Sequence, residues 1–160
     1  MIRRLVIRLA LPLISFAFVN AAFAADNGLI TVQSHYSVKE TIARFEAAVR
    51  AKESLGFIVF TEINHAAAAA KFGLKMRPRT VIIFGNPKLG TPVMVNTPML
   101  AIDVPPKALV WEDDQNKVWL TYNSADYLGD VIYARHGLPN PPSTPKLAAG
   151  LKTFAAYATQ

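Results

Sequence analysis

Glu62 and His65 are the carboxylate and imidazole that lie close together in this sequence. If a strand ends near Glu62 and a helix begins at His65, the two groups can share a cleft and act as general acid and base. The sequence has neither a Gly-x-Ser-x-Gly motif nor a His-Glu-x-x-His motif. A strand-end glutamate is also often solvated. A hydrolase or isomerase is therefore the alternative hypothesis, and we assign no catalytic residue.

A second candidate site is the turn Gly85-Asn86-Pro87-Lys88, which follows an apolar strand and precedes a helix start. Backbone amides at such a position can receive an anion. The competing interpretation is that glycine and proline enforce a tight turn. The turn is not a P-loop, because the Gly-Lys-Ser/Thr signature is missing.

Two further groups complete the candidate ligand site. His65 opens a helix, where the macrodipole disfavours a charged imidazole, so a neutral ring can bind a ligand or simply fix the loop. Arg77 belongs to a basic cluster, which is typical either of a solvated surface or of a site for an anionic ligand. The candidate ligand-binding residues are His65, Arg77, Gly85, Asn86, Pro87, Lys88 and Gly90.

A haem or copper site is a further alternative, because histidine and methionine can ligate both metals. The possible ligands are His35, His65, His136, Met76, Met94 and Met99. None of them has a ligand spacing such as His-x-x-x-His, and core packing is the usual role of methionine. We therefore predict no metal site, and the cofactor, if any, stays unknown.

Residues 1–24 have the layout of a bacterial export signal. Three arginines precede an apolar run, and Ala22-Phe-Ala24 provides the small residues of a cleavage site. We expect cleavage after Ala24 and a periplasmic or secreted protein that meets the membrane only through this signal. The apolar run is shorter than the roughly 20 residues that span a bilayer.

Composition narrows the possible partners. The export signal holds three of the 17 basic residues and none of the 11 acidic ones, so cleavage lowers the net charge from +6 to +3. A nucleic-acid partner is therefore not expected. The chain contains no cysteine, which excludes disulfides, thiol nucleophiles and Cys-ligated zinc.

The elements that must position these residues follow from hydrophobic spacing. Alternation predicts a strand over 29–35, and Ser37 with Glu40 forms a capping box that opens a helix. Asn64 can cap a short alanine-rich helix, against which another element should pack closely. The apolar run 81–84 has no polar face, which predicts a strand covered on both sides.

The second half of the chain predicts a hairpin and two helices. Residues 107–112 and 117–123 alternate around a polar four-residue loop. Ser124 then caps a helix, and a Pro-rich linker leads to a tail helix that starts near Pro145. The order is β-α-β-α-β-α-β-β-α. We expect an α+β, two-layer domain with a mixed sheet of about five strands packed against helices.

Several motifs resemble the domain of unknown function (DUF) 302 family. They are Ser37-Val-Lys-Glu-Thr41, Gly56-Phe57, Ile63-Asn-His65, Leu74, Arg77-Pro78, Phe84-Gly-Asn-Pro87, Gly90-Thr91, Asp103-Val-Pro105 and Leu109-Val-Trp-Glu-Asp113. The resemblance implies a compact α+β domain over residues 25–138 that pairs as a homodimer, with residues 139–160 as linker and tail. It implies no catalytic activity. Asn64 stands where the family pattern has aspartate, which weakens a carboxylate-assisted role for His65.

Together these features favour an exported, homodimeric protein that binds a small-molecule or anionic ligand or serves as an accessory domain. The ligand is expected to contact both His65 and the turn from Gly85 to Gly90. A pocket that joins Glu62, His65 and Asn86 would favour an enzyme, whereas a flat apolar surface there would favour a protein partner.

Overall fold

The computed structural model describes residues 27–160, so the predicted export signal lies outside the described residues. Five strands form one sheet in the order β1-β5-β4-β3-β2, and all four pairings are antiparallel. The strands are β1 (Leu29–Ser34), β2 (Ile58–Asn64), β3 (Arg79–Gly85), β4 (Lys107–Glu112) and β5 (Val118–Asn123). The predicted α+β class, five strands and element order are confirmed. The sheet is antiparallel, however, and not mixed.

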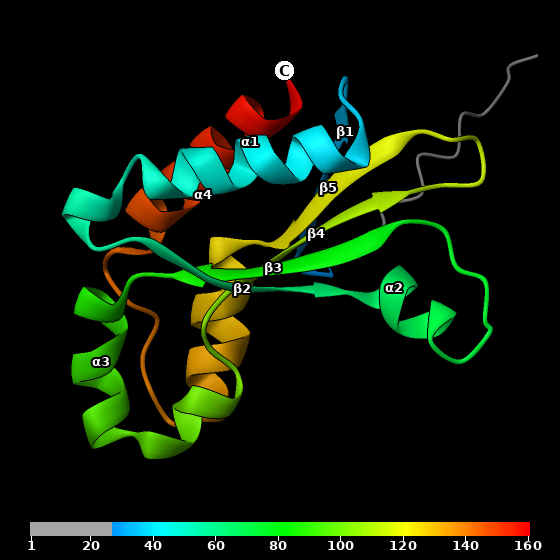
Figure 1. Ribbon diagram of the computed structural model, residues 1–160. Coiled ribbons are helices and arrows are strands. Elements are labelled where there is room, and N and C mark those ends of the chain that lie inside the picture. The colour runs from blue at the N-terminus through cyan, green and yellow to red at the C-terminus, as the bar shows by residue number, and fades with distance from the viewer. Residues whose placement is uncertain (1–26) are drawn as a thin grey trace, which may run out of the picture.

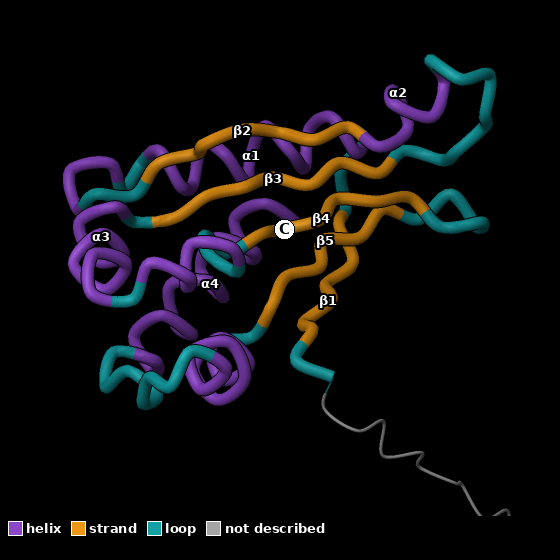
Figure 2. The backbone as a smooth tube through the Cα atoms, turned by 90° about the horizontal axis from the view of Figure 1, so that it is seen from below, coloured by secondary structure: helices purple, strands orange, loops and turns teal. Residues whose placement is uncertain are grey.

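Two long helices cover one face of the sheet (Figure 1). They are α1 (Val38–Arg50) and α4 (Thr144–Thr159), which pack against each other. The shorter α2 (His65–Ala70) follows β2 at one end of the sheet. At the other end lie α3 (Pro87–Asn96), a 3₁₀ segment (Pro98–Ile102) and a π-helical segment (Tyr127–Tyr133), as Figure 2 shows from below.

The predicted helix caps form. The Ser37 hydroxyl accepts a hydrogen bond from the Glu40 amide at 3.2 Å and begins α1. Asn64 Oδ1 accepts from the Ala67 amide at 2.8 Å and begins α2. Each bond satisfies an amide that the helix itself leaves free. The start of α2, and with it the end of β2, is therefore fixed by local sequence.

The core lies between the sheet and the two long helices. Phe45 of α1 and Phe84 of β3 meet edge to face, with ring centroids 5.1 Å apart. Phe154 of α4 meets both of these rings, each at 6.3 Å. Since Phe154, Leu151 and Ala158 are all buried, α4 belongs to this core. Residues 139–160 are therefore part of the packed domain and not an appended tail.

The apolar strand β3 is an inner strand, but it is not covered on both sides as predicted. It lies second from one edge, between β4 and the edge strand β2. Ile82 and Phe84 are buried under α1, while Val81 and Ile83 on the opposite face are only half-buried. The sequence does not reveal the alternation of buried and half-buried side chains, because both faces of this strand carry apolar residues. In the described chain, no helix crosses the middle of that second face (Figure 2).

Candidate functional site

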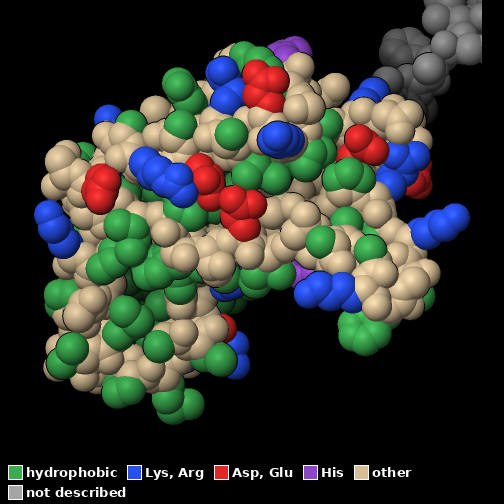
Figure 3. All heavy atoms as spheres, in the orientation of Figure 1, with side chains coloured by type: hydrophobic (Ala, Val, Ile, Leu, Met, Phe, Trp, Pro, Cys, Tyr) green, Lys and Arg blue, Asp and Glu red, His purple; other side chains and the backbone are tan. Residues whose placement is uncertain are grey.

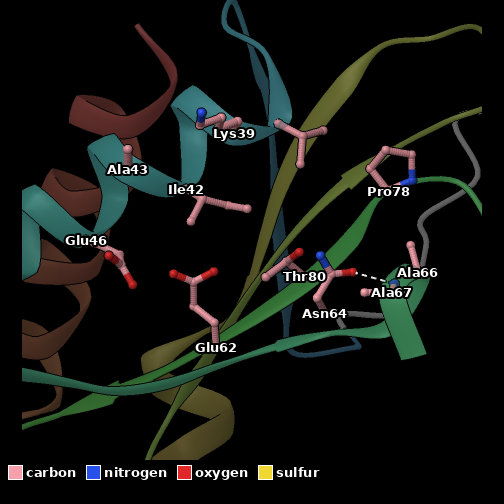
Figure 4. A pocket seen from close by; sticks show the side chains of 11 residues that line it. Lys39, Ile42, Ala43, Glu46, Glu62, Asn64, Ala66, Ala67, Pro78 and Thr80 are labelled. Carbon is pink, nitrogen blue, oxygen red and sulfur yellow. Dashed lines mark hydrogen bonds between the residues drawn. The ribbon is translucent and has the colours of Figure 1, made fainter. Parts of the chain in front are cut away.

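A cleft of about 610 Å³ opens between α1 and the edge strand β2, with α2 at one end (Figure 4). Its size is within the range of small-molecule sites. Its walls come from four elements, namely α1, β2, β3 and the start of α2. The lining residues are Val38, Lys39, Ile42, Ala43, Glu46, Glu62, Asn64, Ala66, Ala67, Pro78 and Thr80.

Two carboxyl groups face each other in this cleft. Glu46 lies on the flank of the α1 stripe that buries Phe45 and Val49, so its side chain leaves the helix beside the core. Glu62 is paired with Ile82, whose buried side chain lies under α1, and cross-strand partners share one face of a sheet. Glu62 therefore projects toward α1, and Figure 4 shows the two carboxyl groups pointing toward one another.

The environment raises the pKa of Glu46. Burial is the largest cause, followed by the hydrogen bond with Glu62 and the repulsion of its charge. Arg50 opposes the shift through an ion pair of 3.0 Å between its Nη2 and Glu46 Oε2. The side chain of Glu46 is 14 % exposed. The pair therefore retains a proton to a higher pH than an isolated glutamate, and it can bind a cation or exchange a proton with a ligand.

Unpaired polar groups lie further along the cleft. Thr80 is 3 % exposed, and its hydroxyl has no hydrogen-bond partner in residues 27–160. The neighbouring Asn64 uses its Oδ1 to cap α2, whereas its amide nitrogen is likewise unpaired there. In Figure 4 both side chains line the cleft. The Thr80 hydroxyl is not among the fully buried atoms and Asn64 is exposed, so both groups are accessible to a ligand or to water in the cleft.

The alanine run of α2 does not pack against another element as predicted. Most of the helix is exposed, and Ala66 and Ala67 form the end wall of the cleft. Their small side chains leave this wall open. His65, the first residue of α2, is exposed and does not line the cleft. No hydrogen bond joins it to Glu62 in the described structure, so the predicted acid–imidazole pair does not form.

The predicted shared site of His65 and the Gly85–Gly90 turn is not formed. Asn64 pairs with Thr80 at one end of the β2–β3 hairpin, and Ile58 pairs with Gly85 at the other. At about 3.3 Å per residue, His65 and Asn86 lie roughly 20 Å apart. A small ligand cannot contact both. The two halves of the candidate site must therefore be judged separately.

In the turn itself, the side chains bind the protein. Asn86 Nδ2 donates to the Leu55 carbonyl at 3.0 Å, and Lys88 Nζ donates to the Ser54 carbonyl at 3.3 Å. The amide of Gly90 donates to the Asn86 carbonyl at 2.9 Å. Pro87 occupies the first turn of α3 as predicted, whereas Pro92 lies inside that helix. The geometry favours the tight-turn interpretation over the anion site.

Arg77 is also committed to internal contacts. Its guanidinium pairs with Glu112 at 2.8 Å and with Asp114 at 3.1 Å. It donates a further bond to Asn116 Oδ1 at 2.8 Å. Arg77 therefore links the β4–β5 turn to the segment that precedes β3. Its positive charge is neutralised by Glu112 and Asp114.

An imidazole–carboxylate pair that the sequence analysis missed lies beyond the sheet. His136 Nε2 lies 2.7 Å from Asp103 Oδ2, and Arg135 reaches the other oxygen of Asp103 at 3.1 Å. Since 33 residues separate the pair, no local spacing could reveal it. The three histidines lie on separate elements, and residues 27–160 contain no group of three or more histidine and acidic side chains placed to hold a metal ion.

A second hollow, of about 420 Å³, lies between β1 and α4. Its walls are mainly apolar, and Lys152 is its single charged side chain. It has no pair of facing carboxyl side chains like that of the first cleft. The cleft between α1 and β2, which we call the glutamate cleft, is therefore the better candidate site.

The profile of the domain of unknown function DUF302 matches residues 30–152. The chain belongs to the DUF302 family. A crystal structure of a DUF302 protein from Bacillus stearothermophilus aligns with a TM-score of 0.60 at 19% identity, over 83% of this chain and 96% of that one. At this identity the likeness concerns the fold alone. No activity comes with the family description.

Fluoride-specific ion channels from Brucella also contain a DUF302-like part. The chain is 42% identical over 135 residues to FluC 1 of Brucella suis and to FluC 1 of Brucella abortus. These matches cover 83% of this chain but 50% and 47% of the two relatives. The chain thus spans about half the length of the relatives. Within the part of the chain described here, no helix is long and apolar enough to cross a membrane.

Proposed function

We propose that this DUF302 protein is an exported, homodimeric accessory domain that binds a small ligand in the glutamate cleft. The observation that carries the proposal is the cleft itself. It has the volume of a small-molecule site, and it gathers a carboxyl pair, a buried hydroxyl and an amide beside apolar walls. We assign the turn at Gly85–Gly90 and the side chain of Arg77 to the fold, because Asn86 Nδ2, Lys88 Nζ and the Arg77 guanidinium bind other groups of the protein.

The accessory role is supported by the channel relatives. A channel requires membrane-spanning segments whose backbone groups are all paired within the protein. The described part of this chain has no helix of that kind. In the relatives we therefore assign the channel itself to the half that this chain does not match. The matched half is a DUF302 domain attached to a transport protein, and we propose a corresponding partnership with a membrane protein for this chain.

Export is supported by residues 1–24, with their arginines, apolar run and small-residue cleavage site. An exported domain would act in the periplasm or outside the cell. In that compartment the glutamate cleft could bind small molecules before they reach a membrane partner. Fractionation of tagged protein tests this step, because a cytoplasmic protein that still begins with Met1 contradicts it.

The homodimer is supported by the face of the sheet that faces away from α1 and α4. An antiparallel sheet with a solvated face usually carries polar residues there. This face instead has the cross-strand pair Trp111 and Trp119, whose rings stack at 6.2 Å, together with Leu109 and Val81. Apolar and aromatic groups gathered on one surface are typical of an interface.

The oligomer is tested by placing a charge on this face. Ile63 is 43 % exposed and lies opposite Val81, so Ile63→Lys should convert the dimer to a monomer in light scattering. Leu55→Lys, at an exposed site away from the strands, is the control and should leave the dimer intact. A wild-type protein that is monomeric at high micromolar concentration contradicts the homodimer.

Ligand binding is tested by native mass spectrometry of protein purified from its own host. The wild type should carry a small non-covalent mass. Ala43→Phe fills the cleft from α1 and should abolish this mass, whereas Ala47→Phe, one turn further along and outside the cleft, should retain it. A wild type without bound mass, or a mass that persists in Ala43→Phe, contradicts the proposed function.

A further inference from the structure

We infer that the glutamate cleft is specific for small aliphatic amines, bound as ammonium ions between Glu46 and Glu62. This inference rests on the proposed function, because it names the chemical class of the ligand for the same site. It also departs from the anionic ligand that the basic residues of the sequence favoured.

The charge of the cleft requires a cation. Two carboxyl groups face each other, and Arg50 contacts only Oε2 of Glu46. Arg50 is 56 % exposed and lies on the outer side of the pair. Lys39, the other base of the cleft, lies seven residues before Glu46 on α1, about 10 Å along the helix axis. The position between the carboxyl groups is therefore left to a proton or to a ligand cation.

The remaining groups favour an organic ammonium ion over a metal. A calcium ion takes six to eight oxygen ligands, and two glutamates supply too few. The cleft is also far larger than one ion needs. Val38, Ile42 and Pro78 provide apolar walls that suit a short carbon chain.

The Thr80 hydroxyl is the second, independent sign of a ligand. The residue is 3 % exposed and lines the cleft, and its hydroxyl has no hydrogen-bond partner in the described chain. With the unpaired amide nitrogen of Asn64 beside it, it can bind a hydroxyl or a second amino group of the ligand. The cleft thus presents acceptors for a cation at one end and neutral hydrogen-bonding groups at the other.

Binding should depend on pH. Burial, and then the interaction with the Glu62 carboxyl, raise the pKa of Glu46, so Glu46 keeps its proton to a higher pH than a free glutamate does. An ammonium ion replaces that proton. Affinity should therefore rise as pH increases through the raised pKa of Glu46, whose charged neighbours are Glu62 and Arg50.

The test is isothermal titration of the protein with putrescine, butanediol, succinate and calcium. Putrescine should bind, and the neutral diol, the dianion and the metal should not. Glu62→Gln keeps the shape of the side chain but removes one charge, and it should weaken putrescine binding about tenfold or more. Glu53→Gln, an exposed glutamate outside the cleft, is the matched control and should bind as the wild type does.

Three outcomes would overturn the inference. If succinate or calcium binds more tightly than putrescine, the ligand of the cleft belongs to another chemical class. If Glu62→Gln binds putrescine as tightly as the wild type does, the carboxyl pair is not part of the binding site. No binding of putrescine excludes the amine, and the bound mass in native mass spectrometry then decides separately whether the proposed function survives. Circular dichroism of each variant establishes that it is folded.

Discussion

Glu46 on α1 and Glu62 on β2 are 16 residues apart in sequence, yet their carboxyl groups point toward one another in one cleft, where burial and the neighbouring Glu62 carboxyl together raise the pKa of Glu46. Proteins rarely place two like charges together at the edge of the core without a compensating role. In Figure 3, acidic and basic side chains lie side by side on the surface of the molecule. The relationship has consequences for both stability and binding.

The first prediction concerns the pH dependence of stability. The raised pKa means that folded Glu46 holds its proton more tightly than unfolded Glu46 does. Its ionisation therefore costs stability, and this cost appears as pH rises from about 4.5 through the folded pKa. Glu62→Gln removes the opposing charge, so it should raise the free energy of unfolding by about 0.5 kcal/mol at pH 7.5.

Urea unfolding at two pH values tests whether Glu62→Gln raises the free energy of unfolding. The gain should vanish well below the ordinary glutamate pKa of 4.5, where Glu46 is protonated in both the folded and the unfolded protein. Glu53→Gln should show no gain at either pH. A loss of stability in Glu62→Gln at pH 7.5 would show that the pair is not under charge repulsion.

The second prediction concerns Gly56, which has φ +99°. A Cβ at this position would lie 2.7 Å from Asn86 Oδ1 and 2.8 Å from Lys88 Cδ. Gly56→Ala should therefore destabilise the protein by about 1–3 kcal/mol, from both the backbone conformation and the clash.

Gly150→Ala is the control for Gly56→Ala. It lies inside α4 with open space around it, so a Cβ should stabilise the helix by about 0.5–1 kcal/mol. Chemical denaturation measures both variants. If the two substitutions have the same effect, the close approach of Gly56 and Asn86 does not exist in solution.

The third prediction concerns α4. Phe154 is 3 % exposed and meets the rings of Phe45, Phe57 and Phe84. Phe154→Ala should cost about 3–5 kcal/mol, the usual loss for a buried aromatic side chain. Lys152→Ala, on the exposed side of α4, should cost less than about 0.5 kcal/mol. A small loss in Phe154→Ala would mean that residues 139–160 are a loosely attached tail.

The fourth prediction separates Arg77 from ligand binding. Arg77→Ala removes ion pairs to Glu112 and Asp114, so it should lower the free energy of unfolding by about 1 kcal/mol. It should leave putrescine affinity unchanged, because Arg77 does not line the glutamate cleft. The neighbouring Arg79 forms no ion pair within the described residues, and Arg79→Ala serves as the control. A large change in the putrescine affinity of Arg77→Ala would show that this residue takes part in ligand binding.

Local sequence predicted the elements well, because local interactions decide them. The Ser37 and Asn64 caps, the β4–β5 hairpin and the proline-led start of α4 all depend on residues a few positions apart. The place of β3 in the sheet depends on which strands pair with it. Its apolar residues gave no sign that one face remains half-exposed.

The site was harder to predict than the fold. Glu62 was recognised as a candidate, but the expected partner was His65, three residues away. The strand register instead brings Glu62 to Glu46, on an element that precedes it in the chain. The turn at Asn86 was assigned to the same ligand site as His65 for a related reason. Its strand-end position suggested a ligand, whereas Asn86 reaches back to Leu55 and fixes the entrance to β2.

The most direct test of the glutamate cleft is an NMR titration of uniformly labelled protein with putrescine, followed through backbone amide shifts. We predict that the largest changes occur at Asn64, Ala67 and Thr80, which line the cleft. Amides of the Lys88–Gly90 turn, at the far end of the β2–β3 hairpin, should not move. Changes confined to that turn, or no changes at all at millimolar putrescine, would contradict the assignment of the cleft as the ligand site.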